Sequence, residues 1–107
     1  MIKAVFYKKN DKYFGFSLNG HAGYADYGKD IVCSAVSALA FNTVNSIERL
    51  TDDHVIYEVS ESGSLRCKVV SDVSSESALL INSLYIGLTG IEDEKGRNFV
   101  KVYIREV

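Results

Sequence analysis

Apolar and polar residues alternate along the first 20 positions of the chain, with the period of two that a half-buried β-strand requires. The first run, residues 2–7, places apolar side chains at every second position: Ile2, Ala4 and Phe6. A second run, residues 13–21, does the same after a polar turn at 8–12: Phe14, Phe16 and Leu18. We therefore predict a β-hairpin whose alternating apolar residues face one core.

The period changes after residue 30. Residues 31–50 are rich in alanine and apolar on most of a helical circumference, which predicts a largely buried helix. The polar segment 51–53 ends this helix. The runs 55–59 and 65–70 then predict a second hairpin across the turn Ser-Glu-Ser-Gly-Ser.

The last third of the chain predicts one more helix and one more strand. The helix begins near the serines at 74 and 75, ends at about Ile91, and carries apolar residues at helical spacing: Ala78, Ile81, Leu84, Tyr85, Leu88 and Ile91. Residues 99–104 predict a closing strand. The order is ββαββαβ, an α+β fold with two helices packed on a mainly antiparallel sheet, and we predict a single domain over residues 1–107.

Composition narrows the classes of function. The chain has 12 Lys and Arg against 14 Asp and Glu and shows no basic stripe, which argues against direct binding of nucleic acid. No apolar run approaches the roughly 20 residues that span a bilayer, so we expect no membrane association. Two cysteines in a chain of ordinary composition suggest a reducing compartment, and we predict a cytoplasmic protein.

Candidate chemistry lies at the start of the first predicted helix. Asp30 is a favoured N-cap type, which makes Cys33 the third helical residue. A cysteine in the first turn feels the partial positive charge of the helix N-terminus, which favours the thiolate. The N–H groups of Cys33 and Ser34 belong to the same turn and are candidates to hold a developing oxyanion.

His21 is the matching base. On the second strand it shares the parity of the polar positions, so alternation does not send it into the core. The eight residues from Ala22 to Lys29 are enough to turn back and bring His21 beside Cys33. The alternative remains that Cys33 is a small packing residue and His21 an ordinary surface group.

The segment between these two residues predicts a lid. Three glycines give the approach to the helix unusual conformational freedom: Gly20, Gly23 and Gly28. Tyr24 and Tyr27 are candidates to cover an extended peptide, and a mobile lid admits substrate and then excludes water.

Several neighbouring residues have two interpretations. Asp30 either caps the helix or orients His21 as a third catalytic member, and its position favours the cap. Ser37 lies one helical turn after Cys33, where it either bonds the loop or permits close packing. Cys67 has the parity of a core residue, and the acidic segment 91–95 has the composition of a solvated helix end. His54 has no partner at metal-ligand spacing, so we expect no metal site.

Residues 20–25 and 28–37 resemble a known family. They match the segments G-H-A-x-Y-A and G-x-D-I-V-C-[SA]-A-x-S of the ribosomal-processing cysteine proteases, called Prp. The resemblance covers the whole chain, and both segments stand at the spacing of the family.

The resemblance implies a bacterial cysteine endopeptidase without a metal or cofactor. Family members remove an N-terminal extension from large-subunit ribosomal protein L-twenty-seven, cleaving after a pair of phenylalanines, and form homodimers. The family's nucleophile maps onto Cys33 and its general acid and base onto His21. The walls of a phenylalanine-selective site have four aromatic candidates in this chain: Tyr24, Tyr27, Phe41 and Tyr85.

Two other functions remain open from the residues alone. The first is a non-catalytic module that binds a peptide of a ribosomal protein, in which His21 and Cys33 are incidental. The second is a redox domain, which lacks a resolving cysteine near Cys33 if Cys67 faces the core.

Overall fold

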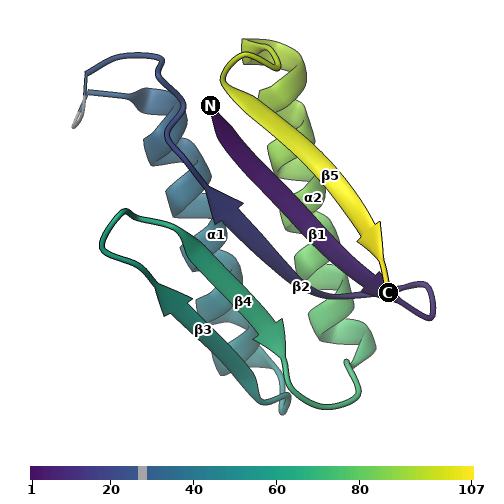
Figure 1. The fold of residues 1–107 in the computed structure, drawn as a ribbon. Coiled ribbons are helices and arrows are strands. Elements are labelled where there is room, and N and C mark those ends of the chain that lie inside the picture. The colour runs from purple at the N-terminus through teal and green to yellow at the C-terminus, as the bar shows by residue number, and fades with distance from the viewer. Residues whose placement is uncertain (27–28) are drawn as a thin grey trace.

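Two helices cover one face of a five-stranded sheet and leave its other face open (Figure 1). The computed structural model describes residues 1–26 and 29–107. Along the chain the elements are β1 (Ile2–Lys9), β2 (Lys12–Asn19), α1 (Ile31–Leu50), β3 (Val55–Val59), β4 (Leu65–Val69), α2 (Ser75–Lys95) and β5 (Val100–Glu106). This confirms the predicted fold class and element order, although α2 is longer than expected.

The strands lie in the order β3-β4-β2-β1-β5. All neighbouring pairs are antiparallel except β1 and β5, which run parallel with Ile2 opposite Val100. The first strand of the chain therefore lies inside the sheet, between β2 and the last strand.

The core lies between the sheet and the helices. Phe6 and Phe16 face each other across β1 and β2 and are almost completely buried. From α1, a stripe at helical spacing joins the same hydrophobic cluster: Val32, Val36, Ala40, Val44 and Ile47. Burying each valine or isoleucine of this stripe stabilises the fold by about 1.5–3 kcal/mol, which explains why these positions are apolar.

By length and composition alone, α1 is apolar enough to cross a membrane, contrary to the expectation that no run reaches this length. The core helix of a soluble protein passes the same test, and the buried stripe of α1 packs on the sheet. Core packing accounts for this stripe but not for Leu39, Phe41 and Leu50, which stay exposed, so α1 is not the largely buried helix that its composition predicts.

A β-bulge corrects the predicted parity of the second strand. Tyr7 pairs with Gly15, but the next residue of β1, Lys8, pairs with Tyr13, so Phe14 is the extra residue. Tyr13 consequently points into the core and is buried, while Phe14 leaves the core and lies beside Tyr7 with ring centroids 6.2 Å apart. Simple alternation had assigned these two residues the opposite way.

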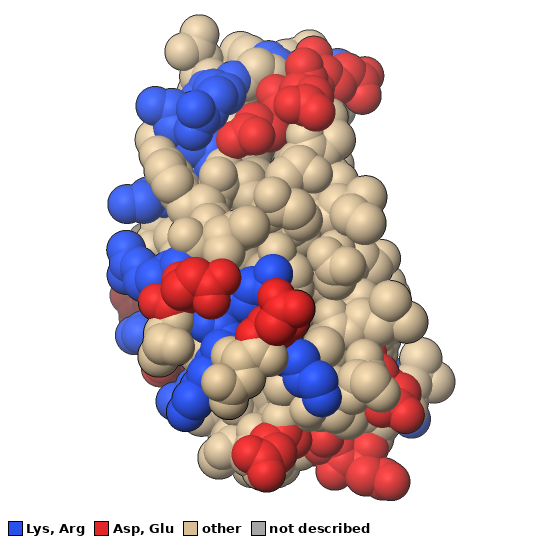
Figure 2. All heavy atoms as spheres, turned by 90° about the vertical axis from the view of Figure 1, so that its right-hand side faces the viewer, with Lys and Arg blue, Asp and Glu red and all other residues tan. Residues whose placement is uncertain are grey.

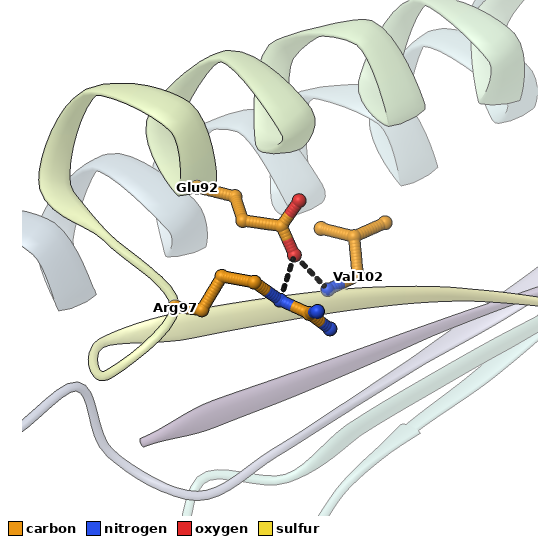
Figure 3. A network of polar contacts seen from close by, with 3 residues as sticks. All are labelled: Glu92, Arg97 and Val102. Atoms are coloured by element: carbon orange, nitrogen blue, oxygen red, sulfur yellow. Dashed lines mark hydrogen bonds and ion pairs between the residues drawn. The ribbon is translucent and has the colours of Figure 1, made fainter.

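The acidic end of α2 is not simply solvated, as the sequence had suggested. Glu92 Oε2 accepts a 2.7 Å hydrogen bond from the Val102 N–H and lies 3.4 Å from Arg97 Nε (Figure 3). The Glu92 side chain is only 15% exposed. This carboxylate therefore joins the end of α2 to β5 and explains why the helix continues to Lys95.

Candidate active site

Asp30 caps α1 as the sequence predicted. Its backbone is extended, with φ −82° and ψ 100°, and Oδ1 accepts hydrogen bonds from the N–H groups of Val32 at 3.0 Å and Cys33 at 3.1 Å. Two donors of the first turn are thereby satisfied by one oxygen. Cys33 is accordingly fixed as the third residue of the helix.

The second oxygen of Asp30 holds the loop that precedes the helix. Oδ2 accepts a 3.0 Å hydrogen bond from the N–H of Tyr24. Burial opposes the charged form of Asp30, but the N–H donors of Cys33 and Tyr24 outweigh it and hold its pKa below the usual range. Across residues 1–26 and 29–107 no hydrogen bond joins Asp30 to His21, so the geometry supports the capping role.

The Cys33 thiol is half-buried and lies against the backbone next to His21. The N–H of Ala22 points at it and donates to Sγ over 3.2 Å. The residue next to His21 thus contacts the sulfur directly through its backbone. No sequence pattern predicts this contact, because Ala22 contributes only its backbone N–H and the position of that group depends on the path of the loop.

Backbone geometry places His21 at the turn that leaves β2. Gly20 has φ +91°, and a Cβ there would collide with the carbonyl oxygen of Met1. The position therefore requires glycine. The Met1 ammonium donates to the carbonyl of His21, and the imidazole stays exposed to solvent. These contacts fix the backbone at His21 and leave its side chain free to reach a substrate.

His21 and Cys33 border the same cavity of about 680 Å³, which lies between the end of β2, the loop and the first half of α1. Cys33, Ser37 and Phe41 all line it at four-residue spacing, so they form a line along one side of the helix. Eight helical residues cover roughly 12 Å, the length of about four residues of an extended peptide. Leu18 and Leu65 add apolar surface from the sheet.

The predicted oxyanion donors are already in use. The Cys33 N–H donates to Asp30 Oδ1, and the Ser34 N–H donates to the Asp30 carbonyl oxygen over 3.1 Å as part of the helix. Neither points to the thiol with an open hydrogen, because the cap and the helix itself satisfy them. Ser34 and Ser37 still line the cavity with their side chains.

Tyr24 does not cover the cavity. Its ring packs edge-on against Phe99 with centroids 5.1 Å apart, and Lys95 Nζ lies 5.6 Å from the ring centre. At Tyr24 the segment that was expected to form a lid therefore packs against the junction of α2 and β5. Gly23, with φ +72°, does line the cavity, whereas Tyr27 and Gly28 lie outside the described residues.

The aromatic residues predicted to form the walls of a phenylalanine-selective site do not all lie at the cavity. Phe41 lines the cavity and is 40% exposed, as a wall for an apolar side chain requires. Tyr85 instead belongs to the core, where its ring stacks on Tyr13 and meets Phe6 edge-on. Of the four candidates, Phe41 is the one that lines the cavity among the described residues, so it remains the candidate for this wall.

Cys67 is a core residue, as predicted. It is only 4% exposed, and burial raises the pKa of its thiol to about 12. Cys33 and Cys67 are both free thiols. A buried thiol of this kind is a poor redox partner, which weakens the redox interpretation.

Replacing Asp30 by asparagine is expected to lower peptide-cleavage efficiency only about fivefold, the effect of losing one hydrogen bond. Asparagine still caps α1, but its amide nitrogen cannot accept from the Tyr24 N–H. Initial rates at several substrate concentrations, with thermal melting as the stability control, measure this. Because the pKa of Asp30 is lowered in the folded protein, its charged form stabilises the fold at pH values above the ordinary aspartate pKa. This stabilisation is lost as the pH falls from there through the lowered pKa.

A loss of more than about 100-fold in a stably folded Asp30→Asn protein would contradict the capping role. That result would show that the negative charge itself acts on His21.

The fold and this cavity define an α+β domain with an accessible thiol at a helix N-terminus beside a histidine, which is the class of the cysteine hydrolases. Comparison with known proteins gives the family. The sequence model of the family "Cysteine protease Prp" matches residues 1–100. The chain belongs to the Prp family of ribosomal-processing cysteine proteases.

Individual relatives agree with this assignment. The ribosomal processing cysteine protease Prp of Staphylococcus aureus strain Mu50 is 32% identical over 82 residues, 76% of this chain and 77% of the relative. The Prp of Bacillus subtilis strain 168 is 29% identical over 98 residues, covering 86% and 88%.

Solved structures share the fold. The essential S. aureus Prp with a covalently linked product peptide superposes with a TM-score of 0.91 and 26% identity, covering 98% of this chain and all of that one. SMU.848 from Streptococcus mutans superposes with a TM-score of 0.83 and 32% identity, covering 100% of this chain and 96% of that one. The S. aureus protein has also been solved with a substrate peptide, with a TM-score of 0.85 and 25% identity over 98% and 100% of the chains.

Proposed function

We propose that this protease removes the N-terminal extension of ribosomal protein L-twenty-seven by cleaving after a pair of phenylalanines, with Cys33 as nucleophile and His21 as general acid and base. The observation that carries the roles is the shared cavity, in which the Cys33 thiol touches the backbone beside His21. The substrate comes from the family resemblance.

The chemistry follows from these positions. His21 accepts the Cys33 proton, and the thiolate attacks the scissile carbonyl carbon. His21 then returns the proton to the leaving amine, which frees the C-terminal product and leaves a thioester. Water hydrolyses the thioester with His21 as base and regenerates the thiol. The cap and the helix hold the N–H groups of Cys33 and Ser34, whereas the N–H of Ala22 donates to the sulfur itself, so we assign the Ala22 N–H to the oxyanion that forms beside this sulfur.

The groove along α1 suits an extended, apolar peptide. Phe41 presents an exposed ring two helical turns along α1 from the thiol, and Leu18 and Leu65 border the same cavity from the sheet, which suits phenylalanine side chains. The related S. aureus protein has been crystallised with a substrate peptide and with a covalently linked product peptide. A peptide that lies in this groove would pass its carbonyl directly over Cys33.

The proposed setting is the cytoplasm, where ribosomes are assembled, and the proposed assembly is a homodimer. Two free thiols suit a reducing compartment. The outer side of α2 exposes Leu79 and Ile86, and Figure 2 shows an almost uncharged band there between acidic groups at the two ends. Contact with a second copy would cover this apolar surface.

The substrate assignment is tested with a synthetic peptide that spans the extension and its junction, compared with a matched peptide in which both phenylalanines are alanine. We expect one cut, after the phenylalanine pair, and cleavage of the alanine peptide to be about 100-fold slower, because two buried aromatic contacts are lost. Mass spectrometry identifies the cut and its rate.

Equal cutting of both peptides would retain the protease but overturn the proposed specificity. Binding without any cut would favour the alternative, a module that only binds the peptide.

A further inference from the structure

The open face of the sheet gathers basic residues that are scattered in the sequence. Strand register places on this face the side chains of Lys3, Arg66, Lys68, Lys101 and Arg105. Lys3 and Lys101 lie directly opposite each other on β1 and β5. Neighbouring like charges repel, so this arrangement costs stability unless an anion lies over it.

Aromatic rings lie among these cations. Lys3 Nζ stands 5.3 Å from the ring centre of Tyr103, which is 39% exposed. Tyr7 and Phe14, brought together by the bulge, form a second aromatic site on the same face. Arg105 lies opposite Tyr7 on β5. The face therefore presents flat rings beside positive charges on adjacent strands.

A hollow of about 570 Å³ separates the Tyr7–Phe14 pair from Arg66 and Lys68. Its floor is formed at Gly15, where a Cβ would approach the Cys67 carbonyl oxygen to 2.6 Å. The missing side chain thus leaves room for a flat group between aromatic rings and cations. Glu58, opposite Arg66 in the register, is the carboxylate that borders this hollow in the described chain.

The charge of this face is opposite to that of the molecule as a whole. The chain carries two more acidic than basic residues, yet Lys and Arg collect along the side of the open sheet in Figure 2, with a few acidic groups between them. The helical side in the same view is almost uncharged except at its ends. Average composition therefore conceals a local surface that attracts polyanions.

We propose that the open sheet face binds single-stranded RNA, with bases stacked on Tyr7, Phe14 and Tyr103 and phosphates held by the surrounding lysines and arginines. Rings and cations alternating on a sheet surface are the chemistry that single strands require, since a base offers a flat face and each linkage one negative charge. An acidic protein would use the cations but not the rings. RNA is preferred to DNA because the family acts in ribosomal processing.

This proposal departs from the expectation drawn from overall charge. It rests on the face opposite to the helices and holds whether or not His21 and Cys33 cleave a particular peptide. Its failure would leave the proposed protease function untouched.

The test is fluorescence anisotropy of the full chain with a labelled, unstructured 12-nucleotide RNA at 50 and 200 mM salt. We expect binding that weakens about 20-fold over this range, as contacts to about three phosphates predict. Lys68→Glu should bind at least about fivefold more weakly, whereas Arg49→Glu, a matched reversal on the helical layer, should bind within about twofold of wild type. Phe14→Leu, which keeps apolar bulk but removes the ring, should weaken binding about fivefold.

Four results would overturn the proposal. They are no binding at 50 mM salt, equal losses in Lys68→Glu and Arg49→Glu, unchanged binding in Phe14→Leu, and displacement of the RNA by oligoglutamate of equal charge. Tighter binding of a DNA of the same sequence would overturn the choice of RNA. Circular dichroism checks each variant, and Lys101→Gln replaces Lys68→Glu if the latter does not fold.

Discussion

The Cys33→Ala protein is expected to bind the extended peptide with wild-type affinity and to cleave it at least about 10⁴-fold more slowly. Alanine removes the sulfur that must form the thioester, and no other step of the proposed mechanism replaces it. The cost to the fold is small, because Cys33 is only half-buried at the edge of the cavity. Calorimetry measures binding, and mass spectrometry measures the rate.

Cys67 provides a matched control for this variant. We expect Cys67→Ala to remain active, and iodoacetamide to modify Cys33 while Cys67 stays protected by burial. Loss of activity should follow labelling of Cys33 alone. Cleavage by Cys33→Ala above background would remove this residue from the role of nucleophile.

His21→Gln is expected to lower turnover by about 10²–10⁴-fold, the usual effect of losing a general acid and base. Glutamine can still donate a hydrogen bond, but it does not accept the thiol proton or deliver it to the leaving amine. The imidazole is exposed and the backbone contacts of His21 do not involve its side chain, so folding should be unchanged.

His54→Gln is the matched control, since His54 is also exposed but follows the far end of α1, roughly 25 Å along the helix from Cys33. This variant should cleave at the wild-type rate. If His21→Gln keeps more than a third of wild-type turnover, or if both substitutions have the same effect, His21 is not the general acid and base.

Features that depend on neighbours in the sequence were predictable. Asp30 and Cys33 are three residues apart, so the capping bond between them follows from helix geometry and residue type. The parity that places Cys67 in the core is equally local. The same local reasoning placed His21 on the second strand, but β2 ends at Asn19 and His21 follows in the turn, and the thiol contact through Ala22 also depends on the path of the loop.

Features that depend on distant strands were not predictable. The bulge exchanges Tyr13 and Phe14 because of how β1 pairs with β2, which no alternation pattern reveals. The Glu92 side chain is shielded from solvent because it accepts a hydrogen bond from the Val102 N–H of β5. The basic face forms only when the strand register brings the lysines and arginines of β1, β4 and β5 to one side of the sheet. The net charge of the chain does not reveal such a local surface.

The parallel pairing of β1 with β5 has a consequence for synthesis of the protein. About 90 residues separate the two strands, so at typical elongation rates β1 waits roughly 5–20 s for its partner. During that time one side of β1 presents unpaired backbone groups, which are prone to pair with other chains. The loop beside the thiol must wait as well, because the Tyr24 ring rests on Phe99, immediately before β5. In a nascent molecule the loop beside Cys33 therefore gains its contact with Phe99 only after the end of the chain has been made.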